Sequence, residues 1–218
     1  MGYSVAIDGP AGAGKSTIAK RVAKERDFIY IDTGAMFRAM AIHFLRCGIA
    51  ADDHEKISNA VKDVSVTISY VNGEQQVFLN GENVTGQLRT EEVGNMASAS
   101  SVVGDVRKKL LELQRNLAAS ANVVMDGRDI GTVVLPNADV KVYLTASVEV
   151  RAQRRYKELI EKGQTEDLEK IKKDIEERDY RDMNREIAPL RQAEDAVLVD
   201  SSDMTIDESV QAILDLIK

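Results

Sequence analysis

Eight residues near the start of the chain have the types and spacing to wrap around a row of phosphates. Residues 9–16 read Gly-Pro-Ala-Gly-Ala-Gly-Lys-Ser and match GxxxxGK[ST]. In this pattern glycines let the backbone approach the anion, and a helix N-terminus presents free N–H groups to it. Lys15 can reach the β- and γ-phosphates, and the Ser16 hydroxyl can bind Mg²⁺. We expect a nucleoside triphosphate to contact Gly9, Pro10, Ala11, Gly12, Ala13, Gly14, Lys15, Ser16 and Thr17.

Two segments that combine acidic and basic side chains come directly after predicted strands. Residues 32–38 read Asp-Thr-Gly-Ala-Met-Phe-Arg, and residues 126–131 read Asp-Gly-Arg-Asp-Ile-Gly. Asp126 could organise Mg²⁺ or its waters behind Ser16, and Asp8 is a second candidate for that place. Both aspartates end a predicted strand, at the edge where α/β proteins place their ligands.

A third segment, residues 177–185, carries charges at helical spacing. Arg178, Asp182 and Arg185 fall at i, i+4 and i+7, so one helix face bears all three. With Arg38 and Arg128, the chain has more arginines in these segments than one triphosphate needs. Two anionic groups would therefore be held together, and arginines that neutralise and align them would supply the catalysis. If the acceptor is itself a phosphate, its oxyanion is already nucleophilic and needs no general base.

The elements that must position these segments are five short, nearly continuous apolar stretches, typical of parallel strands that are covered on both faces. Helical patterns separate them, which predicts right-handed crossovers and one parallel sheet. The expected strands are residues 5–8, 28–32, 123–126, 140–145 and 196–200.

Residues 63–88 break this α/β rhythm. Residues 64–70 alternate apolar and polar side chains, as in a half-buried strand. The pairs Asn72-Gly73 and Asn80-Gly81 are strong hairpin signals. Residues 84–85 would complete a small three-stranded antiparallel sheet, inserted into the α/β core.

Residues 151–186 form a second distinct region. Gly163 interrupts a helical stretch that carries Arg151, Arg154 and Arg155, and a highly charged helix is expected over about residues 166–182. Such a region can be a solvated helical surface with ion pairs, or a mobile lid whose arginines close over the phosphates. The phosphate loop favours the lid.

The composition limits the class of protein. The 218 residues suit one α/β domain with an insertion. The net charge of −7 argues against a protein that coats nucleic acid, and no apolar run approaches the ~20 residues of a membrane span. We expect a cytoplasmic monomer without nucleic-acid or membrane partners, since no signal segment or large unpaired apolar stripe is present. Cys47, the single cysteine, is expected to fill core space.

In their order and spacing these motifs resemble the bacterial-type cytidylate kinases, a family of P-loop nucleoside monophosphate (NMP) kinases, over essentially the whole chain. The segments that carry the resemblance are residues 7–10, 31–38, 88–93, 126–132, 177–185 and 188–190. The resemblance implies transfer of the γ-phosphoryl group of ATP to CMP or dCMP, with Mg²⁺. It also implies a parallel core at residues 1–37, 103–150 and 187–218, an NMP-binding region at 38–102 and a lid at 151–186.

The same resemblance implies roles for individual residues. The acceptor's phosphate would contact Thr33, Arg38, Arg128 and Arg185, and its ribose would contact Asp182. Cytosine would be recognised by Ser98, Arg107 and Asp129, because a carboxylate can accept a hydrogen bond from the exocyclic amine that uracil lacks. The transferring phosphoryl group would meet Lys15, Arg128, Arg178, Arg185, Arg154 and Arg155. Phe37 stands where many relatives have tyrosine, so any hydroxyl contact from that position is missing.

Two other functions remain open on the residues alone. A P-loop kinase for another acceptor, such as shikimate or a different nucleotide, would share the phosphate loop, but the 63–88 insertion with Arg107 and Asp129 argues against it. A nucleotide-dependent switch would bind partners through the inserted sheet. The chain has no Asn-Lys-x-Asp segment, which guanine-specific switches usually carry.

Overall fold

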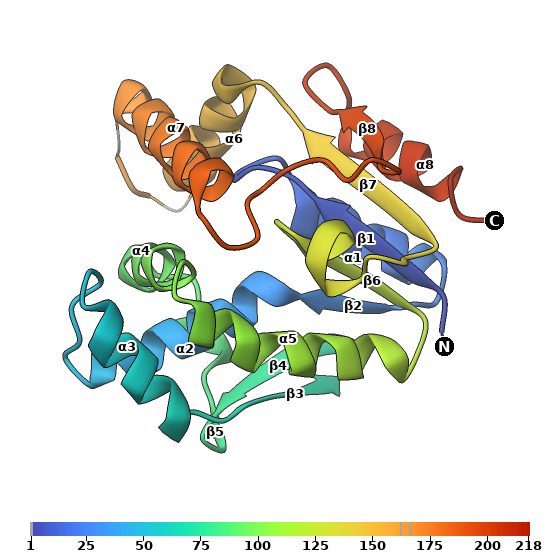
Figure 1. Ribbon diagram of the computed structural model, residues 1–218. Helices are drawn as coiled ribbons and strands as arrows, with labels where there is room; N and C mark the ends of the chain where they lie inside the picture. Colours follow the sequence, from blue (N-terminus) through green and yellow to red (C-terminus); the bar gives the residue numbers. More distant parts are fainter. Residues whose placement is uncertain (1, 162, 166) are drawn as a thin grey trace. The chain divides into compact units, whose positions relative to one another are not determined.

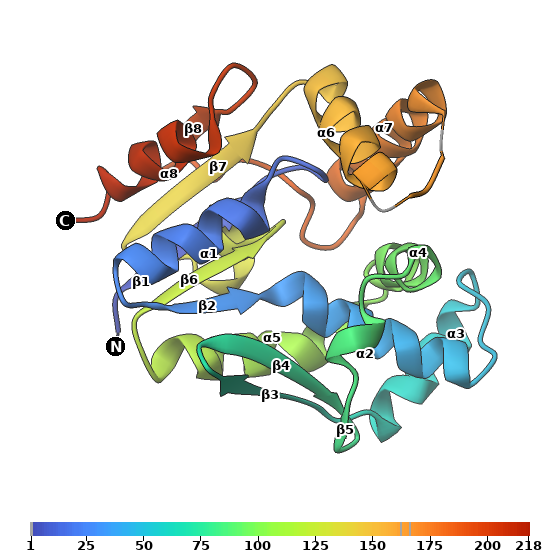
Figure 2. The ribbon, with the colours of Figure 1, turned by 180° about the vertical axis from the view of Figure 1, so that it is seen from behind.

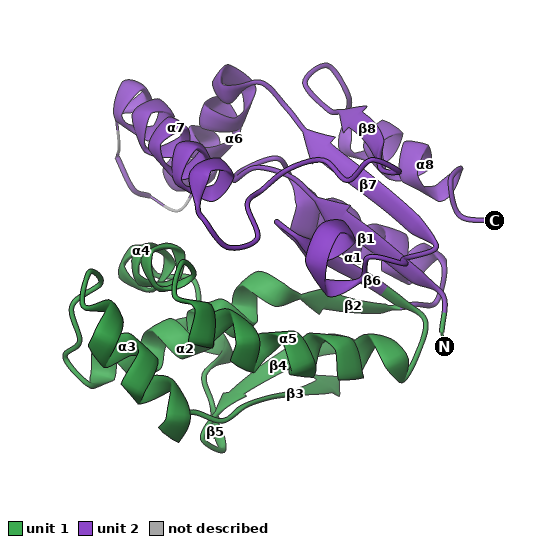
Figure 3. Ribbon diagram, viewed as in Figure 1, with its two compact units in different colours: residues 1–2, 29–123 green, residues 3–28, 124–218 purple. Residues whose placement is uncertain are grey.

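The structure is a computed structural model that describes residues 2–161, 163–165 and 167–218 (Figure 1). The chain divides into two compact units. Unit 1 contains Gly2 and residues 29–123, and unit 2 contains residues 3–28 and 124–218 (Figure 3).

A five-stranded sheet has the order β2-β6-β1-β7-β8. Its strands are β1 (Ser4–Asp8), β2 (Ile29–Asp32), β6 (Val123–Gly127), β7 (Val140–Thr145) and β8 (Val197–Asp200). β1 pairs with β7 and β7 with β8, both in parallel, with Ile7 opposite Val142 and Val142 opposite Val197. The predicted parallel sheet is therefore confirmed, with strand bounds that differ from the expected ones by one residue at most.

In unit 2 the sheet is covered by helices with apolar stripes. Helix α1 (Lys15–Glu25) buries Ile18 and Val22, and α8 (Ile206–Leu214) buries Val210 and Ile213. The two helices contact each other and lie on the same face of the sheet (Figure 2). Thr205 begins α8 with a capping box, because its hydroxyl accepts from the backbone N–H of Glu208 while the Glu208 carboxylate accepts from the backbone N–H of Thr205.

Strand β8 differs from the expectation of burial on both faces. Val197 and Leu198 are 44% and 55% exposed, whereas Val199 is 6% exposed. The reason is its place in the sheet, because β8 is the last strand in the order and follows a loop rather than a covering helix. A continuous apolar run predicts a strand, but the number of covered faces depends on its neighbours.

The inserted sheet lies in unit 1 and has the order β3-β4-β5. Its strands are β3 (Val66–Val71), β4 (Glu74–Leu79) and β5 (Glu82–Asn83). Both predicted hairpin turns are confirmed, since each asparagine and glycine of the two Asn-Gly pairs has positive φ.

The third strand of this sheet comes two residues earlier in the chain than predicted, at Glu82–Asn83 instead of residues 84–85. Val84 donates its backbone N–H to the carbonyl of Val77, but the Thr85 side chain, rather than its main chain, accepts from the N–H of Val77. The chain then turns into a short 3₁₀ helix at Thr85–Gln87. A side-chain acceptor has replaced the main-chain partner, so residues 84–85 do not extend the strand.

The helices of unit 1 are α2 (Thr33–Arg46), α3 (His54–Ala60), α4 (Glu91–Ser100) and α5 (Gly104–Ala119), with a 3₁₀ turn at Val61–Asp63. Helix α2 contacts α4, α5 and β4 and buries Met36, Met40 and Phe44. Cys47, expected to fill the core, is exposed instead at the C-terminal end of α2. The helix ends at Arg46, so Cys47 is its C-cap and lies beyond the buried apolar residues of α2.

Two antiparallel helices of unit 2, α6 (Val148–Glu161) and α7 (Leu168–Asn184), form a hairpin. They pack through Ala152, Leu159, Ile171 and Ile175. Gly163 has a φ of 73°, which is consistent with its predicted role as a helix breaker. The predicted first residue of the charged helix, residue 166, lies outside the described residues, and the helix extends to Asn184.

Candidate active site

The phosphate loop connects β1 to α1, as the strand-loop-helix pattern predicts. Gly12 and Gly14 have φ of 76° and 84°, a region that favours glycine. At Gly9 a Cβ atom would lie 1.9 Å from the carbonyl oxygen of Leu144, so only glycine fits there. Gly14 begins α1 without a side-chain cap, which leaves the first N–H groups of the helix for an anion.

Lys15 is buried beside this loop with 6% of its surface exposed. Its Nζ donates to the carbonyl oxygen of Pro10 at 2.7 Å. Burial lowers the pKa of Lys15, and the nearby positive charge of Arg128 lowers it further, while Asp126 and Asp182 oppose the change. The ammonium group is thus already desolvated, and its hydrogen bond is to a neutral carbonyl. An anionic partner would stabilise its charge more strongly.

The two aspartates considered for Mg²⁺ have different partners. Asp126 accepts a hydrogen bond from Ser16 Oγ at 3.0 Å, so it orients the hydroxyl of the phosphate loop. Asp8 instead accepts from the backbone N–H groups of Ile130 and Gly131, at 2.8 and 2.7 Å. Burial raises the pKa of Asp8 to about 6, although these two hydrogen bonds lower it.

Asp8 thereby holds a π-helical turn, η3 (Ile130–Val134), that follows Asp129. π-Helical turns are rare and are frequently found at functional sites. At Gly131 a Cβ would approach Lys141 Cδ to 3.2 Å, so a side chain at this position would require the Lys141 side chain to shift slightly.

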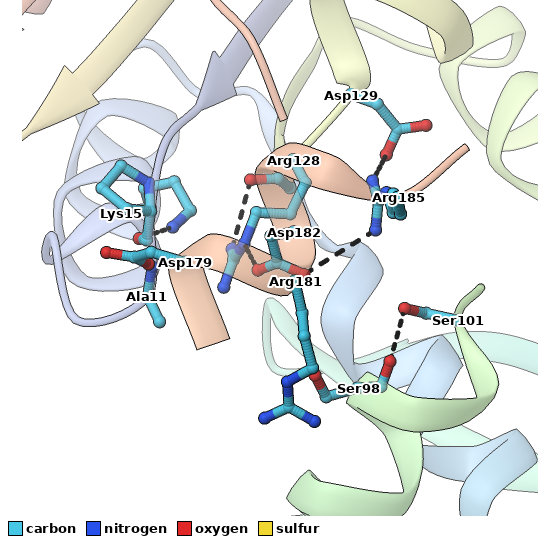
Figure 4. Close-up of polar contacts among 12 residues, drawn as sticks. Ala11, Lys15, Ser98, Ser101, Arg128, Asp129, Asp179, Arg181, Asp182 and Arg185 are labelled. Carbon is cyan, nitrogen blue, oxygen red and sulfur yellow. Dashed lines mark hydrogen bonds and ion pairs between the residues drawn. The ribbon is translucent and has the colours of Figure 1, made fainter. Parts of the chain in front are cut away.

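Four charged side chains of unit 2 form one network of alternating sign (Figure 4). Arg128 Nε donates to Asp182 Oδ2 at 2.8 Å. Arg185 lies between two carboxylates, with Nη1 3.9 Å from Asp182 Oδ1 and Nη2 donating to Asp129 Oδ1 at 3.4 Å. The side chains of Asp129, Asp182 and Arg185 are 8%, 8% and 3% exposed, so these three groups are almost inaccessible to solvent.

The charges in this network stabilise one another. Burial would raise the pKa of Asp182, but Arg128, helped by Arg178 and Arg185, lowers it below its usual value. Burial likewise opposes the charge on Arg128, yet the Asp182 carboxylate raises its pKa. Asp182 therefore remains ionised, and the arginines keep a fixed geometry.

Arg185 lies just beyond α7, which ends at Asn184. Its Nε donates to the carbonyl oxygen of Ala188 at 2.7 Å, and Ala188 itself has a φ of 51°. The N–H of Leu190 donates back to the carbonyl oxygen of Asp182. The predicted common face of Arg178, Asp182 and Arg185 is thus completed by a folded loop and not by the helix alone.

A buried ion pair that the sequence analysis did not single out joins the α6–α7 hairpin to the phosphate loop. Arg151 Nη1 donates to Asp179 Oδ2 at 2.6 Å and to the carbonyl oxygen of Ala11 at 2.9 Å. Asp179 Oδ1 accepts from the N–H of Ala11 at 3.3 Å. The only hint in the sequence is that Asp179 follows Arg178 directly, which does not identify its partner.

The other predicted arginines of α6 have structural partners. Arg154 Nη2 donates to the carbonyl oxygen of Ser201 at 2.7 Å. Arg155 Nη1 pairs with Glu158 Oε2 at 3.0 Å, and both side chains are exposed. In the described residues these two guanidinium groups therefore contact neither the phosphate loop nor the network of Arg128 and Arg185.

In unit 1, Asp32 organises the start of α2. Its Oδ1 accepts from the N–H of Ala35 at 2.9 Å, which caps the helix. Its Oδ2 pairs with Arg89 at 3.1 Å, and Oδ1 lies 4.0 Å from Arg38 Nη1. Thr33, the first residue of α2, is 3% exposed.

The predicted cytosine-reading residues of unit 1 lie at the junction of α4 and α5. Arg107 Nη1 donates to the carbonyl oxygen of Ser101 at 3.2 Å, and its guanidinium lies 5.4 Å from the ring centroid of Phe37. Ser101 Oγ donates to the carbonyl oxygen of Ser98 (Figure 4). Among the described residues, the buried Ser98 Oγ has no hydrogen-bond partner. Phe37 thus supports Arg107 with its ring, a contact that needs no tyrosine hydroxyl.

A family model described as cytidylate kinase matches residues 5–218. The chain belongs to the cytidylate kinase family. It is 50% identical over 216 residues to a cytidylate kinase from Leuconostoc mesenteroides subsp. mesenteroides, covering 99% of this chain and 96% of that one. It is also 51% identical over 214 residues to a cytidylate kinase from Ligilactobacillus salivarius, covering 98% and 96%.

One solved structure shares the fold of this cytidylate kinase family chain. An uncharacterized protein from Eubacterium ventriosum ATCC 27560 covers 100% of this chain and 98% of its own, with a TM-score of 0.54 at 12% identity. This likeness concerns the fold alone. Within the residues that the structure describes, no helix has the length and apolar character to cross a bilayer.

Proposed function

We propose that this chain transfers the γ-phosphoryl group of ATP to CMP or dCMP, giving ADP and CDP or dCDP. The observation that carries the proposal is the phosphate loop with its buried Lys15 in a chain of the cytidylate kinase family. Family membership also decides against shikimate as acceptor and against a nucleotide-dependent switch. The acceptor is then a phosphate monoester, which needs no general base.

On the donor side, residues 9–17 would wrap around the phosphates of ATP. Lys15 would exchange the carbonyl of Pro10 for the β- and γ-phosphates. Mg²⁺ fits here because Ser16 and Asp126 offer the oxygen atoms that this ion prefers, already in contact with each other. When bound, Mg²⁺ would neutralise phosphate charge, and Asp126 would keep the Ser16 hydroxyl turned toward it.

On the acceptor side, we assign the phosphate of CMP to Thr33, Arg38, Arg128 and Arg185, and the ribose to Asp182. The network of unit 2 supports its part of this assignment, because Arg128 and Arg185 are held in place by carboxylates before any ligand binds. Fixed cations of this kind stabilise charge in the transition state without reorganising. Arg178 is the lid arginine that we assign to the transferring phosphoryl group, since Arg154 and Arg155 are engaged elsewhere.

Base recognition is assigned to Ser98, Arg107 and Asp129. Asp129 would accept from the exocyclic amine of cytosine, while Arg107 and Ser98 would donate to the ring nitrogen and carbonyl. The buried Ser98 hydroxyl, which lacks a partner among the described residues, supports this role. Uracil would leave the Asp129 carboxylate facing an oxygen atom, which costs binding free energy.

We assign residues 38–102 to NMP binding and the α6–α7 region, residues 151–186, to a lid, around a core of residues 1–37, 103–150 and 187–218. The monomeric state, the cytoplasmic location and the absence of nucleic-acid or membrane partners stay predictions from the sequence. Light scattering during gel filtration tests the first of these.

The decisive experiment is a coupled assay of ADP release with MgATP against CMP, dCMP, UMP, AMP and shikimate in parallel. We expect strong turnover with the two cytidine nucleotides only. Preference for another acceptor would retain a kinase but remove the roles of Ser98, Arg107 and Asp129. A lack of acceptor-dependent ADP release would contradict the proposed function as a whole.

A further inference from the structure

The inserted sheet of unit 1 contacts the end of β2 through one cross-strand pair of side chains. Tyr70 on β3 and Gln75 on β4 are directly opposite each other in the register. Gln75 Oε1 accepts from the backbone N–H of Asp32 at 2.9 Å, and Gln75 Nε2 donates to the carbonyl oxygen of Asp32 at 3.2 Å. Tyr70 Oη donates to the carbonyl oxygen of Tyr30 at 3.2 Å. Two residues of the insertion thus make three hydrogen bonds to two residues of β2.

The position of this pair in the sheet is unusual for polar side chains. Gln75 shares its face of β4 with Val77 and Leu79, which are 1% and 2% exposed. Val77 is opposite Ile68 on β3, and Leu79 is opposite Val66. An apolar pair would continue this pattern. The polar pair at its end therefore indicates that this part of the sheet has a role other than filling a core.

The main-chain groups that the pair contacts belong to the free edge of β2. Tyr30 and Asp32 are two residues apart, so their N–H and C=O groups point to the same side of the strand. β2 is the first strand in the order of the five-stranded sheet and has one strand neighbour there. The Tyr70–Gln75 pair takes the place of a further strand on that edge, with side chains in place of a backbone ladder.

The consequence for the site follows from what comes next in the chain. Asp32 is the N-cap of α2, and its carboxylate contacts the N–H of Ala35 and the guanidinium of Arg89. Thr33 and Arg38 lie in the first turns of the same helix. Any displacement of the Asp32 backbone therefore moves the start of α2 and both of these side chains.

We propose that Tyr70 and Gln75 are positioning residues for the acceptor's phosphate, holding the end of β2 so that α2 presents Thr33 and Arg38 correctly. This inference rests on the proposed role of Thr33 and Arg38 in binding that phosphate. In this proposal the inserted sheet helps to fix the geometry of the acceptor site. Burial raises the pKa of Tyr70 to about 12, so its hydroxyl stays protonated and continues to donate at any physiological pH.

The test replaces Gln75 by methionine, which has a similar shape but no amide. The matched control is Gln76→Met, because Gln76 is the next residue on the same strand, is also half-buried, and accepts from the side chain of Asn83 rather than contacting β2. We expect Gln75→Met to raise the KM for CMP roughly ten-fold, with the KM for ATP changed by less than about two-fold, since two hydrogen bonds to buried main-chain groups are lost. Gln76→Met should leave both constants within about two-fold of the wild type.

A second measurement follows the hydrogen bond between Asp32 and Gln75 independently of enzymatic activity. The amide of Asp32 donates to Gln75, so its hydrogen exchange should accelerate in Gln75→Met and not in Gln76→Met. If Gln75→Met does not fold, Tyr70→Phe decides the question, because it removes one hydroxyl and should raise the KM for CMP by about three-fold. A lower melting temperature with an unchanged KM for CMP would mean that the pair only stabilises the fold, and it would overturn the proposal.

Arg38→Met, assayed alongside, separates this inference from the function on which it rests. If Arg38→Met raises the KM for CMP and Gln75→Met and Tyr70→Phe do not, the positioning role is wrong while the acceptor site stands. If Arg38→Met leaves the KM for CMP unchanged, the acceptor site is wrongly placed and the inference is overturned with it. Wild-type protein without CMP-dependent turnover would remove the proposed function itself.

Discussion

Three arginines of unit 2 and two arginines of unit 1 are held in different ways. In unit 2, Arg128, Arg151 and Arg185 each pair with a carboxylate, and the three side chains are 20%, 5% and 3% exposed. In unit 1, Arg107 contacts a backbone carbonyl and the ring of Phe37, and Arg89 pairs with Asp32 through a side chain that is 61% exposed.

This difference separates two tasks that a phosphoryl-transfer enzyme must perform. Buried, paired arginines keep their geometry without a ligand, which suits groups that stabilise a developing charge. Their cost is that removal of one partner leaves an uncompensated charge inside the protein. Arginines with a neutral partner or an exposed side chain can change partner when an acceptor arrives, and their removal should affect binding more than folding.

The largest expected effect tests the buried pairs. Arg151→Met should reduce the free energy of unfolding by about 3–5 kcal/mol, because Asp179 would stay buried without its cation. Arg155→Met, on the same helix, removes an exposed pair with Glu158 and should cost less than about 1 kcal/mol. Urea unfolding of both variants measures the two values.

The Arg151→Met, Asp179→Leu double variant sharpens this prediction. It removes both charges, so it should recover a large part of the lost stability. Equal destabilisation by Arg151→Met and Arg155→Met would contradict the contrast between buried and exposed pairs.

Lys15→Ala should lower kcat by on the order of 10²–10³ or more, because it removes charge stabilisation of the transition state. Its effect on stability should be small, since the Lys15 ammonium is desolvated and its pKa is lowered by burial. Steady-state kinetics and a thermal melt give the two readouts. Lys24→Ala, an exposed lysine of the same helix, is the control, and normal turnover of a folded Lys15→Ala would remove the phosphate-loop assignment.

Asp129→Ala should reduce the preference for CMP over UMP by on the order of 10–10², because the proposed acceptor for the exocyclic amine is lost. Asp129 also pairs with Arg185, so acceptor binding should weaken as well, while the KM for ATP should change less. The ratio of kcat/KM for the two nucleotides measures the effect. An unchanged ratio would count against Asp129 as the residue that reads the base.

The smallest expected effect concerns the lid. If the α6–α7 region closes over both ligands, limited proteolysis near Gly163 should slow several-fold when ATP and CMP analogues are bound together. Cleavage fragments identified by mass spectrometry locate the site. A rate that does not respond to ligands would show that this region is not a lid, and the Arg151–Asp179 pair would then anchor a static hairpin.

Local patterns predicted the elements of this protein well. The phosphate loop depends on glycine conformation and on a strand before and a helix after it, all within residues 4–25. The two Asn-Gly turns were equally predictable, because their backbone angles are a property of those residue pairs. β8 and Cys47 were misjudged for the opposite reason, since exposure depends on which elements cover a residue.

The sequence by itself determined that this chain has a phosphate loop, a parallel sheet, an inserted antiparallel sheet and a surplus of arginines. Only the tertiary structure decided which donor each carboxylate meets: the Ser16 hydroxyl for Asp126, backbone N–H groups of the η3 turn for Asp8, and the Arg151 guanidinium for Asp179. The physical reason is range. Backbone conformation follows from neighbouring residues, whereas the partner of a buried carboxylate depends on which distant segments the fold brings together, over separations of 28 to 123 residues.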